Sequence, residues 1–206
     1  MPDPEKITSL DELLALYGAA NPTSLAKETR QLTPEYRRWI EAAPFFAIAS
    51  CAAAGLDCSP RGDTSGELFR VLDERTLAIP DRRGNNRLDT LRNIIADPRV
   101  ALLFLIPGIE ECVRINGRAS ITADAELIDG FAVGDRTPAT VILVEIDAVY
   151  FQCARALTRA RLWDPSTRAN REAIPTAGQM TRGALPGFDA ETYDTQLAPR
   201  HKATLY

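Results

Sequence analysis

The middle of the chain consists of short apolar runs separated by polar turn residues, a pattern that is typical of β-strands. Residues 45–55 (FFAIASCAAAG) predict a strand, and residues 56–63 (LDCSPRGD) predict a return strand that ends in a loop. Residues 68–81 predict a hairpin whose turn lies near residues 73–75. Further strands are predicted at residues 100–108, 111–121 and 140–153.

Helical signals flank these runs. Ser9 can cap a short helix that runs to about Leu16, and Thr33, with Pro34 at the first helical position, opens a second helix. We expect these helices to form a lid over a β core. The spacing of Leu88, Leu91, Ile94 and Ile95 predicts a helix over residues 86–97, and shorter helices are expected around residues 124–132 and 188–198.

Six or so strands with short turns and one inserted helix predict a mainly β protein, an antiparallel β-barrel with flanking helices, rather than a parallel α/β sheet. The 206 residues are enough for one substantial core and few for two. We therefore expect a helical segment at residues 1–44 and a barrel domain at residues 45–163. The C-terminal extension, residues 164–206, is expected to wrap the barrel or a partner subunit.

The formal net charge of -4 argues against a general nucleic-acid or anionic-membrane binder, which would need a basic surplus over a whole face. No apolar stretch reaches the length of a membrane span. The N-terminal residues MPDPEKITSLDELLALYG lack the basic start and apolar core of a signal peptide. These features predict a cytoplasmic protein that binds neither nucleic acid nor membrane.

Cysteine and histidine offer little material for metal or nucleophilic chemistry. The four cysteines, Cys51, Cys58, Cys112 and Cys153, form no C-x-x-C pair, and His201 is the lone histidine. Cys51 and Cys112 lie in apolar runs, which favours buried free thiols over disulfides. We expect no metal site and no histidine-based catalytic triad.

The stretch AIPDRRGNNRLDTLRN, residues 78–93, places four arginines and three asparagines at a strand-to-helix corner. The first turn of a helix has unpaired backbone N–H groups and the positive end of the helix dipole, so such a corner attracts anions. Gly84 lets the backbone approach a ligand, and the side chains that add donors are Arg82, Arg83, Asn85, Asn86 and Arg87. A phosphate monoester fits this corner; an Asn-capped helix behind a solvated arginine loop is the alternative.

Two other arginine groups accompany this loop. In CSPRGD, Pro60 and Gly62 predict a rigid turn that aims Arg61 at the same anion, although an ordinary polar turn with a surface arginine is equally compatible. In YFQCARALTRARLW, residues 150–163, Arg155 and Arg159 share a helical face near Trp163 and could meet a planar ligand ring. The alternative there is a basic surface helix with Trp163 in the core.

From about Phe45 to Trp163 the chain resembles the pyridoxamine 5'-phosphate oxidase-like, FMN-binding split-barrel family. The resemblance rests on SPRGD, DRxGNNRLDTLRN and GRA elements, and it is closest to a branch of FMN-dependent enzymes. It implies an antiparallel split barrel, a homodimer and an FMN in the groove between the two subunits. In this chain Arg61, Asn85, Asn86 and Arg87 would hold the phosphate, and the backbone of Ile79 and Pro80 would line the flavin. From the partner, the strand around Cys112 and Arg114 and the segment around Gln152 and Arg155 would approach the ring.

Departures from the family bear on activity. Close relatives carry a histidine and a lysine where this chain has Gln152 and Arg155, so no proton-transfer or other catalytic residue is assigned. The C-terminal arginine and histidine pair that vitamin B6 oxidases use has no counterpart, because Arg200 and His201 are adjacent. We expect an FMN-dependent oxidoreductase that acts on an unidentified small-molecule substrate or electron donor. The alternative is a flavin- or haem-binding carrier or sensor without turnover.

Overall fold

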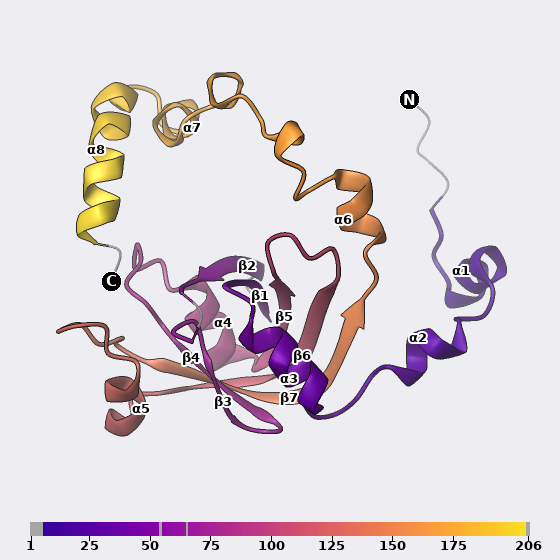
Figure 1. The fold of residues 1–206 in the computed structure, drawn as a ribbon. Coiled ribbons are helices and arrows are strands. Elements are labelled where there is room, and N and C mark those ends of the chain that lie inside the picture. Colours follow the sequence, from indigo (N-terminus) through magenta and orange to yellow (C-terminus); the bar gives the residue numbers. More distant parts are fainter. Residues whose placement is uncertain (1–5, 54, 65, 205–206) are drawn as a thin grey trace.

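The structure, a computed structural model, describes residues 6–53, 55–64 and 66–204 (Figure 1). Its strands pair antiparallel in a single 7-stranded sheet with the order β2-β1-β5-β6-β7-β4-β3. The strands are β1 Phe45–Ala52, β2 Gly55–Gly62, β3 Arg70–Asp73, β4 Thr76–Pro80, β5 Arg99–Leu105, β6 Cys112–Thr122 and β7 Val141–Gln152. Because β2 and β3 remain as the two edges of the sheet, the barrel is split. The predicted mainly β, antiparallel split-barrel class is thus confirmed, with seven strands where six or so were expected.

The helices in the described residues lie outside this sheet. They are α1 Leu10–Tyr17, α2 Pro22–Ala26, α3 Pro34–Glu41, α4 Asp89–Ala96, α5 Ala125–Gly130, α6 Arg155–Ala160, α7 Ala177–Ala184 and α8 Ala190–Ala203. Short 3-10 turns occur at Pro165–Thr167 and Arg171–Ala173. The predicted caps are confirmed: Ser9 forms a capping box with Glu12, and the Thr33 hydroxyl accepts from the backbone N–H of Tyr36. No helix in the described ranges is both long and apolar enough to cross a membrane.

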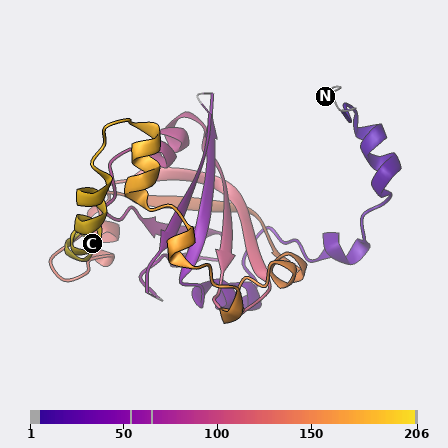
Figure 2. The same cartoon turned by 90° about the horizontal axis from the view of Figure 1, so that it is seen from above.

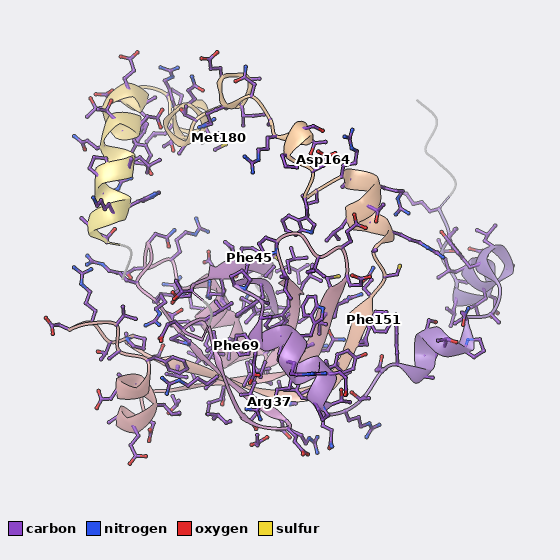
Figure 3. The ribbon with its side chains drawn as sticks, viewed as in Figure 1. Arg37, Phe45, Phe69, Phe151, Asp164 and Met180 are labelled. Carbon is purple, nitrogen blue, oxygen red and sulfur yellow. The ribbon has the colours of Figure 1, made fainter. Side chains whose placement is uncertain are left out.

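An aromatic cluster fills the centre of the barrel. Phe104 lies with its ring centroid 4.9 Å from that of Phe46 and 5.4 Å from that of Phe69, whose side chain Figure 3 shows inside the body. Ile40 of α3 and Ile94 of α4 join the same buried cluster, so both helices cover the core. Helix α4 also contacts β1, β2 and β6. The loop before α4 is therefore anchored at both ends, by buried β4 and by α4.

Helix α4 begins at Asp89, later than the predicted start at Asn86. Asn86 and Leu88 have φ angles of 58° and 60°, a left-handed conformation that a right-handed helix does not continue through. Leu88, outside the helix, is 44% exposed, and Ile95, within it, is 80% exposed. The expected apolar face of this helix is reduced to Leu91 and Ile94.

The two terminal segments leave the barrel in different ways. Helices α1 and α2 project from one side in two perpendicular views (Figures 1 and 2). The C-terminal segment leaves the barrel through α6, beyond which Trp163 Nε1 donates to the carbonyl oxygen of Ile109 (2.7 Å). It then arches over the barrel and returns to it at the end of α8, where Arg136 Nη1 donates to the carbonyl oxygen of Ala203 (3.4 Å) (Figure 1). Met180 of α7 lies far from the sheet in Figure 3. The expectation that this segment wraps the barrel or a partner subunit remains a prediction, as do the proposed domain boundaries; α7 was not predicted.

Gly117 provides a test of the β6–β7 pairing. The register shifts between Asn116 and Gly117, and a Cβ at Gly117 would lie 2.1 Å from the carbonyl oxygen of Glu145. Gly117→Ala should lower the free energy of unfolding by about 2–3 kcal/mol, because the backbone of β7 cannot move without breaking the pairing. Urea denaturation measures this loss. Gly183→Ala in α7, where a Cβ meets open space, is the control and should change stability by less than about 1 kcal/mol; equal losses would contradict the account.

Candidate functional site

The loop between β4 and α4 leaves the barrel at a buried point. Ile79 and Pro80 are the last residues of β4; both are buried, and Pro80 pairs with Val141 of β7. The backbone N–H of Asp81 still donates to the carbonyl oxygen of Thr140 (2.9 Å), and the chain then turns away. The loop thus starts from a fixed position.

Arg82 ties the loop to two other segments. Its Nε donates to Asp63 Oδ2 (3.1 Å), its Nη1 to the carbonyl oxygen of Phe131 (2.6 Å) and its Nη2 to that of Glu67 (3.2 Å). These bonds use all three nitrogens of the guanidinium within the protein. The expectation that Arg82 serves as a donor to an anion is therefore corrected: it is a structural clamp of the loop.

Beyond this clamp the loop exposes its remaining donors. The Asn85 side chain accepts from the backbone N–H of Arg87 (3.1 Å), which is a local turn and not the predicted helix cap. Arg87 is paired with Asp89, from Nε to Oδ2 at 2.8 Å, and its side chain is 74% exposed. The hydrogen bond and the charge of Asp89 raise the pKa of Arg87. Arg87 is therefore a fully charged group that can turn toward a ligand.

Strand β2 presents polar side chains to the same place. Asp57, Ser59 and Arg61 alternate along the strand with its exposed residues, so they share one face. Arg61 pairs with Phe46 of β1, which corrects the prediction that Pro60 and Gly62 form a turn around it. The Arg61 Nη2 lies 3.7 Å from Asp81 Oδ1. The strand, and not a turn, aims this guanidinium at the loop.

A hydroxyl network lies beneath Arg61. The buried Thr90, in the first turn of α4, donates to Asp57 Oδ2 (2.6 Å), and Ser59 donates to the same oxygen (2.8 Å). Burial acts to raise the pKa of Asp57, but these two hydrogen bonds and the charge of Arg61 outweigh it, and the net shift is downward. Asp57 is thus an ionised carboxylate at the start of α4.

Two adjoining cavities meet at Arg61. The first has a volume of about 300 Å³ and is lined by the β2 face and by residues 84–91. The second, of about 490 Å³, is lined by residues 60–64 together with the apolar side chains of Leu68, Ile79 and Pro80. Arg61, Arg82 and Gly84 belong to both linings. A ligand with an anionic end and a flat, largely apolar body matches this pair of cavities.

The structure brings together part of the predicted site. Arg61, Asn85, Asn86 and Arg87 line the first cavity, and Ile79 and Pro80 line the second. Arg114 and Gln152 lie elsewhere on the sheet, with Arg114 Nη1 3.4 Å from Gln152 Oε1. Arg155 lines a third depression with Phe151 and Thr158. Within one chain these residues do not reach Arg61, so their role stays a prediction.

Sequence reasoning missed the carboxylate and hydroxyl side chains of the site. Asp57, Ser59, Asp81 and Thr90 all line the first cavity. The alternation of Asp57 and Ser59 with Arg61 in the predicted strand could have identified the first two. Asp81 and Thr90 gave no such signal, because their neighbours in space come from β2, far away in the chain.

The cysteines remain free thiols: Cys112 is buried, Cys51 is half-buried, and Cys58 and Cys153 are exposed. Burial raises the pKa of the Cys112 thiol. In the described ranges, no group of at least three His, Cys, Asp or Glu side chains could hold a metal ion.

Comparisons with known proteins address the family. The model of the family described as pyridoxamine 5'-phosphate oxidase matches residues 32–153. No curated protein matches the chain. Among solved structures, HupZ of Group A Streptococcus is similar with a TM-score of 0.46 and 16% identity, over 57% of this chain and 91% of that one. General Stress Protein 26 of Bacillus anthracis has a TM-score of 0.42 and 16% identity, over 56% and 88% of the two chains. The FAD binding protein of Mycobacterium smegmatis has a TM-score of 0.42 and 13% identity, over 60% and 97%.

Thr90→Val tests the hydroxyl network. Valine keeps the shape of the buried side chain but removes the hydrogen bond to Asp57, which should lower the free energy of unfolding by about 2 kcal/mol at neutral pH. The lowered pKa of Asp57 means that this stabilisation is complete above the ordinary Asp pKa and is lost as the pH falls through the folded-state value.

The difference in urea stability between wild type and Thr90→Val should therefore shrink below about pH 4. Thr195→Val is the control, because its exposed hydroxyl donates only to the carbonyl oxygen of Glu191 within α8. A difference that stays constant with pH would contradict the assigned ionised state of Asp57.

Proposed function

Because the chain belongs to the pyridoxamine 5'-phosphate oxidase family, we propose that it binds flavin mononucleotide (FMN) and acts as an FMN-dependent oxidoreductase on a small organic molecule. The single observation that carries this proposal is the position of Arg61 between the two adjoining cavities. One cavity offers charged and neutral N–H donors, and the other offers an apolar wall. FMN has a phosphate and a largely apolar ring system to match them.

The first cavity fits a phosphate by its donor set. Arg61 and Arg87 provide guanidinium groups, which bind phosphate in a two-pronged manner. Asn85 and Asn86 provide neutral side-chain donors. Open space lies beside Gly84, where a Cβ would meet no atom within 4 Å, so a ligand can approach the backbone there. In the proposed complex these residues hold the phosphate while Arg82 keeps the loop in place.

The second cavity fits the flavin ring. Leu68, Ile79 and Pro80 present buried apolar surface, and Arg61 lies at its junction with the first cavity. Pro80 has no backbone N–H to donate, and Ile79 is paired with Ile142 of β7. This wall therefore contacts the ring through apolar surface. The wall therefore orients the ring and excludes water from one of its faces.

We further propose a homodimer in which the partner subunit completes the site. Both cavities are open to solvent, and one small split barrel covers one side of a flavin. In this arrangement Arg114, Gln152 and Arg155 of one chain face the ring bound by the other. The exposed position of Phe151, Gln152 and Arg155 at the end of β7 suits a contact with a second copy.

The bound FMN would supply the redox chemistry, by accepting and donating a hydride. The protein's own residues orient the ring and place positive charge near it, and Arg114 and Arg155 are the candidates for that charge. No side chain is assigned as an acid or base. Direct hydride transfer from or to the substrate is therefore the mechanism we propose.

The substrate is proposed to be a molecule other than the phosphorylated B6 vitamins. Their oxidation requires a second phosphate site that faces the flavin, and a desolvated dianion needs several convergent donors. Arg61 and Arg87 are used for FMN in this proposal, which leaves Arg114 and Arg155. A carrier or sensor that binds flavin without turnover is the alternative, and it is distinguished by whether any acceptor reoxidises the reduced flavin faster than oxygen does.

Phosphate recognition is tested by comparing FMN with riboflavin. Arg87→Ala should weaken FMN binding by about tenfold or more, because a charge-assisted hydrogen bond contributes roughly 1.5–3 kcal/mol, and it should leave riboflavin binding unchanged. Quenching of flavin fluorescence measures both affinities. Arg92→Ala, which removes an exposed arginine from α4 outside the cavity lining, is the matched control. Equal affinity of the wild type for FMN and riboflavin would rule out the phosphate cavity.

Subunit sharing is tested by mixing two defective variants. Arg61→Ala and Arg114→Ala should each lose most flavin binding, and sedimentation of the wild-type complex should give about twice 22.6 kDa. After subunit exchange, a mixed dimer regains one intact site, so about a quarter of all sites should bind flavin again. No recovery in an exchanged mixture, or full occupancy of a monomer, would show that one chain builds the site alone.

A further inference from the structure

The first cavity contains as many carboxylates as arginines. Its charged lining consists of Arg61, Arg82 and Arg87 with Asp57, Asp81 and Asp89. Arg82 is bonded within the protein to Asp63 and to the Phe131 and Glu67 carbonyl oxygens, as described above. A phosphate dianion would therefore enter a cavity that has no surplus of positive charge, and the cost of a partly desolvated anion is not met by the arginines alone.

Each remaining arginine is already paired with an aspartate. Arg87 and Asp89 form an ion pair at 2.8 Å, with side chains that are 74% and 38% exposed. Water screens this pair, so Arg87 can leave Asp89 at little cost. Arg61 and Asp81 lie 3.7 Å apart, with side chains that are only 22% and 21% exposed. If Arg61 turned to a phosphate, an ionised Asp81 would lose its partner beside a second anion.

The three carboxylates of this lining differ in their surroundings. Asp57 receives hydrogen bonds from Ser59 and Thr90, which hold its pKa down. Asp89 is screened by water beside Arg87. Asp81 has Arg61 as its one charged partner in the part of the chain that the structure describes.

Burial raises the pKa of Asp81, and the charge of Arg61 opposes this shift. A bound phosphate would draw Arg61 away and add negative charge nearby, and both changes raise this pKa further. Asp57 and Asp89, also in the cavity lining, act in the same direction, whereas Arg82 and Arg87 act against it. Protonation of Asp81 is thus favoured both by its burial and by the arrival of a bound phosphate.

We propose that Asp81 determines the ligand preference of this cavity by taking up one proton when a phosphate monoester binds, which releases Arg61 to the phosphate. In this step a proton passes from solvent to a carboxylate oxygen of Asp81, and no covalent bond of the ligand changes. The inference rests on the proposed function and adds to it a proton-coupled specificity residue.

The coupling predicts how affinity depends on pH. Binding that takes up a proton becomes stronger as the pH falls toward the pKa that Asp81 has in the complex. The phosphate itself takes up a proton near pH 6, which also changes the affinity. The affinities of wild type and variant for the same ligand are therefore compared at the same pH. Riboflavin has no phosphate and should show no such dependence.

Asp81→Asn keeps the shape of the side chain and removes its charge. Well above the pKa that Asp81 has in the complex, this variant should bind FMN about tenfold more tightly than wild type, and the ratio should fall as the pH drops through that pKa. Both proteins should bind riboflavin equally. Asp147→Asn, which makes the same change in net charge at an exposed position of β7, is the control and should behave as wild type.

Calorimetry gives a second readout. Titration with FMN at a series of pH values, in two buffers of different ionisation enthalpy, should show more proton uptake by wild type than by Asp81→Asn, and the protonation of the phosphate itself cancels in this difference. A preference for FMN over riboflavin without this difference in proton uptake, and with a pH-independent Asp81→Asn ratio, would overturn this inference and leave the proposed function intact. If wild type binds FMN no better than riboflavin, the proposed function fails, and the inference with it.

Discussion

Arg61 stands opposite Phe46 in the pairing of β2 with β1, and this register determines the geometry of the candidate site. Phe46 is buried against Phe104, so β1 cannot slide, and β2 must keep the face that bears Asp57, Ser59 and Arg61 toward α4. The loop from β4 is held to the same place by the guanidinium of Arg82. The β2 strand and the loop before α4 are thus held beside each other by backbone pairing and by the half-buried Arg82 clamp, before any ligand binds.

Much of the fold could be predicted from local pattern. Alternating apolar runs gave the strands, and Ser9, Thr33 and Pro34 gave two helix starts because capping depends on neighbouring residues alone. The start of α4 was misplaced because Asn86 and Leu88 adopt left-handed backbone angles that a periodicity argument does not detect. Helix α7 was also missed, because its two glycines, Gly178 and Gly183, lower the local helix propensity.

The candidate site, like the fold, could be predicted from the sequence only in part. A loop rich in arginine and asparagine is visible in the sequence, but which arginine is available is not. Arg82 is bonded to Asp63 and Phe131, and Asp57 to Thr90; each pair is distant along the chain, so no spacing rule connects them. The first cavity has equal numbers of arginines and aspartates only because the folded barrel places β2 beside α4.

The central claim is that Arg61 and Arg87 hold a phosphate where β2 meets the loop before α4. A crystal structure of the protein with bound FMN tests it most directly. The account predicts phosphate oxygens within hydrogen-bond distance of both guanidinium groups and the ring against Ile79 and Pro80. An FMN bound with its phosphate in solvent, or at any other part of the barrel, would contradict the account.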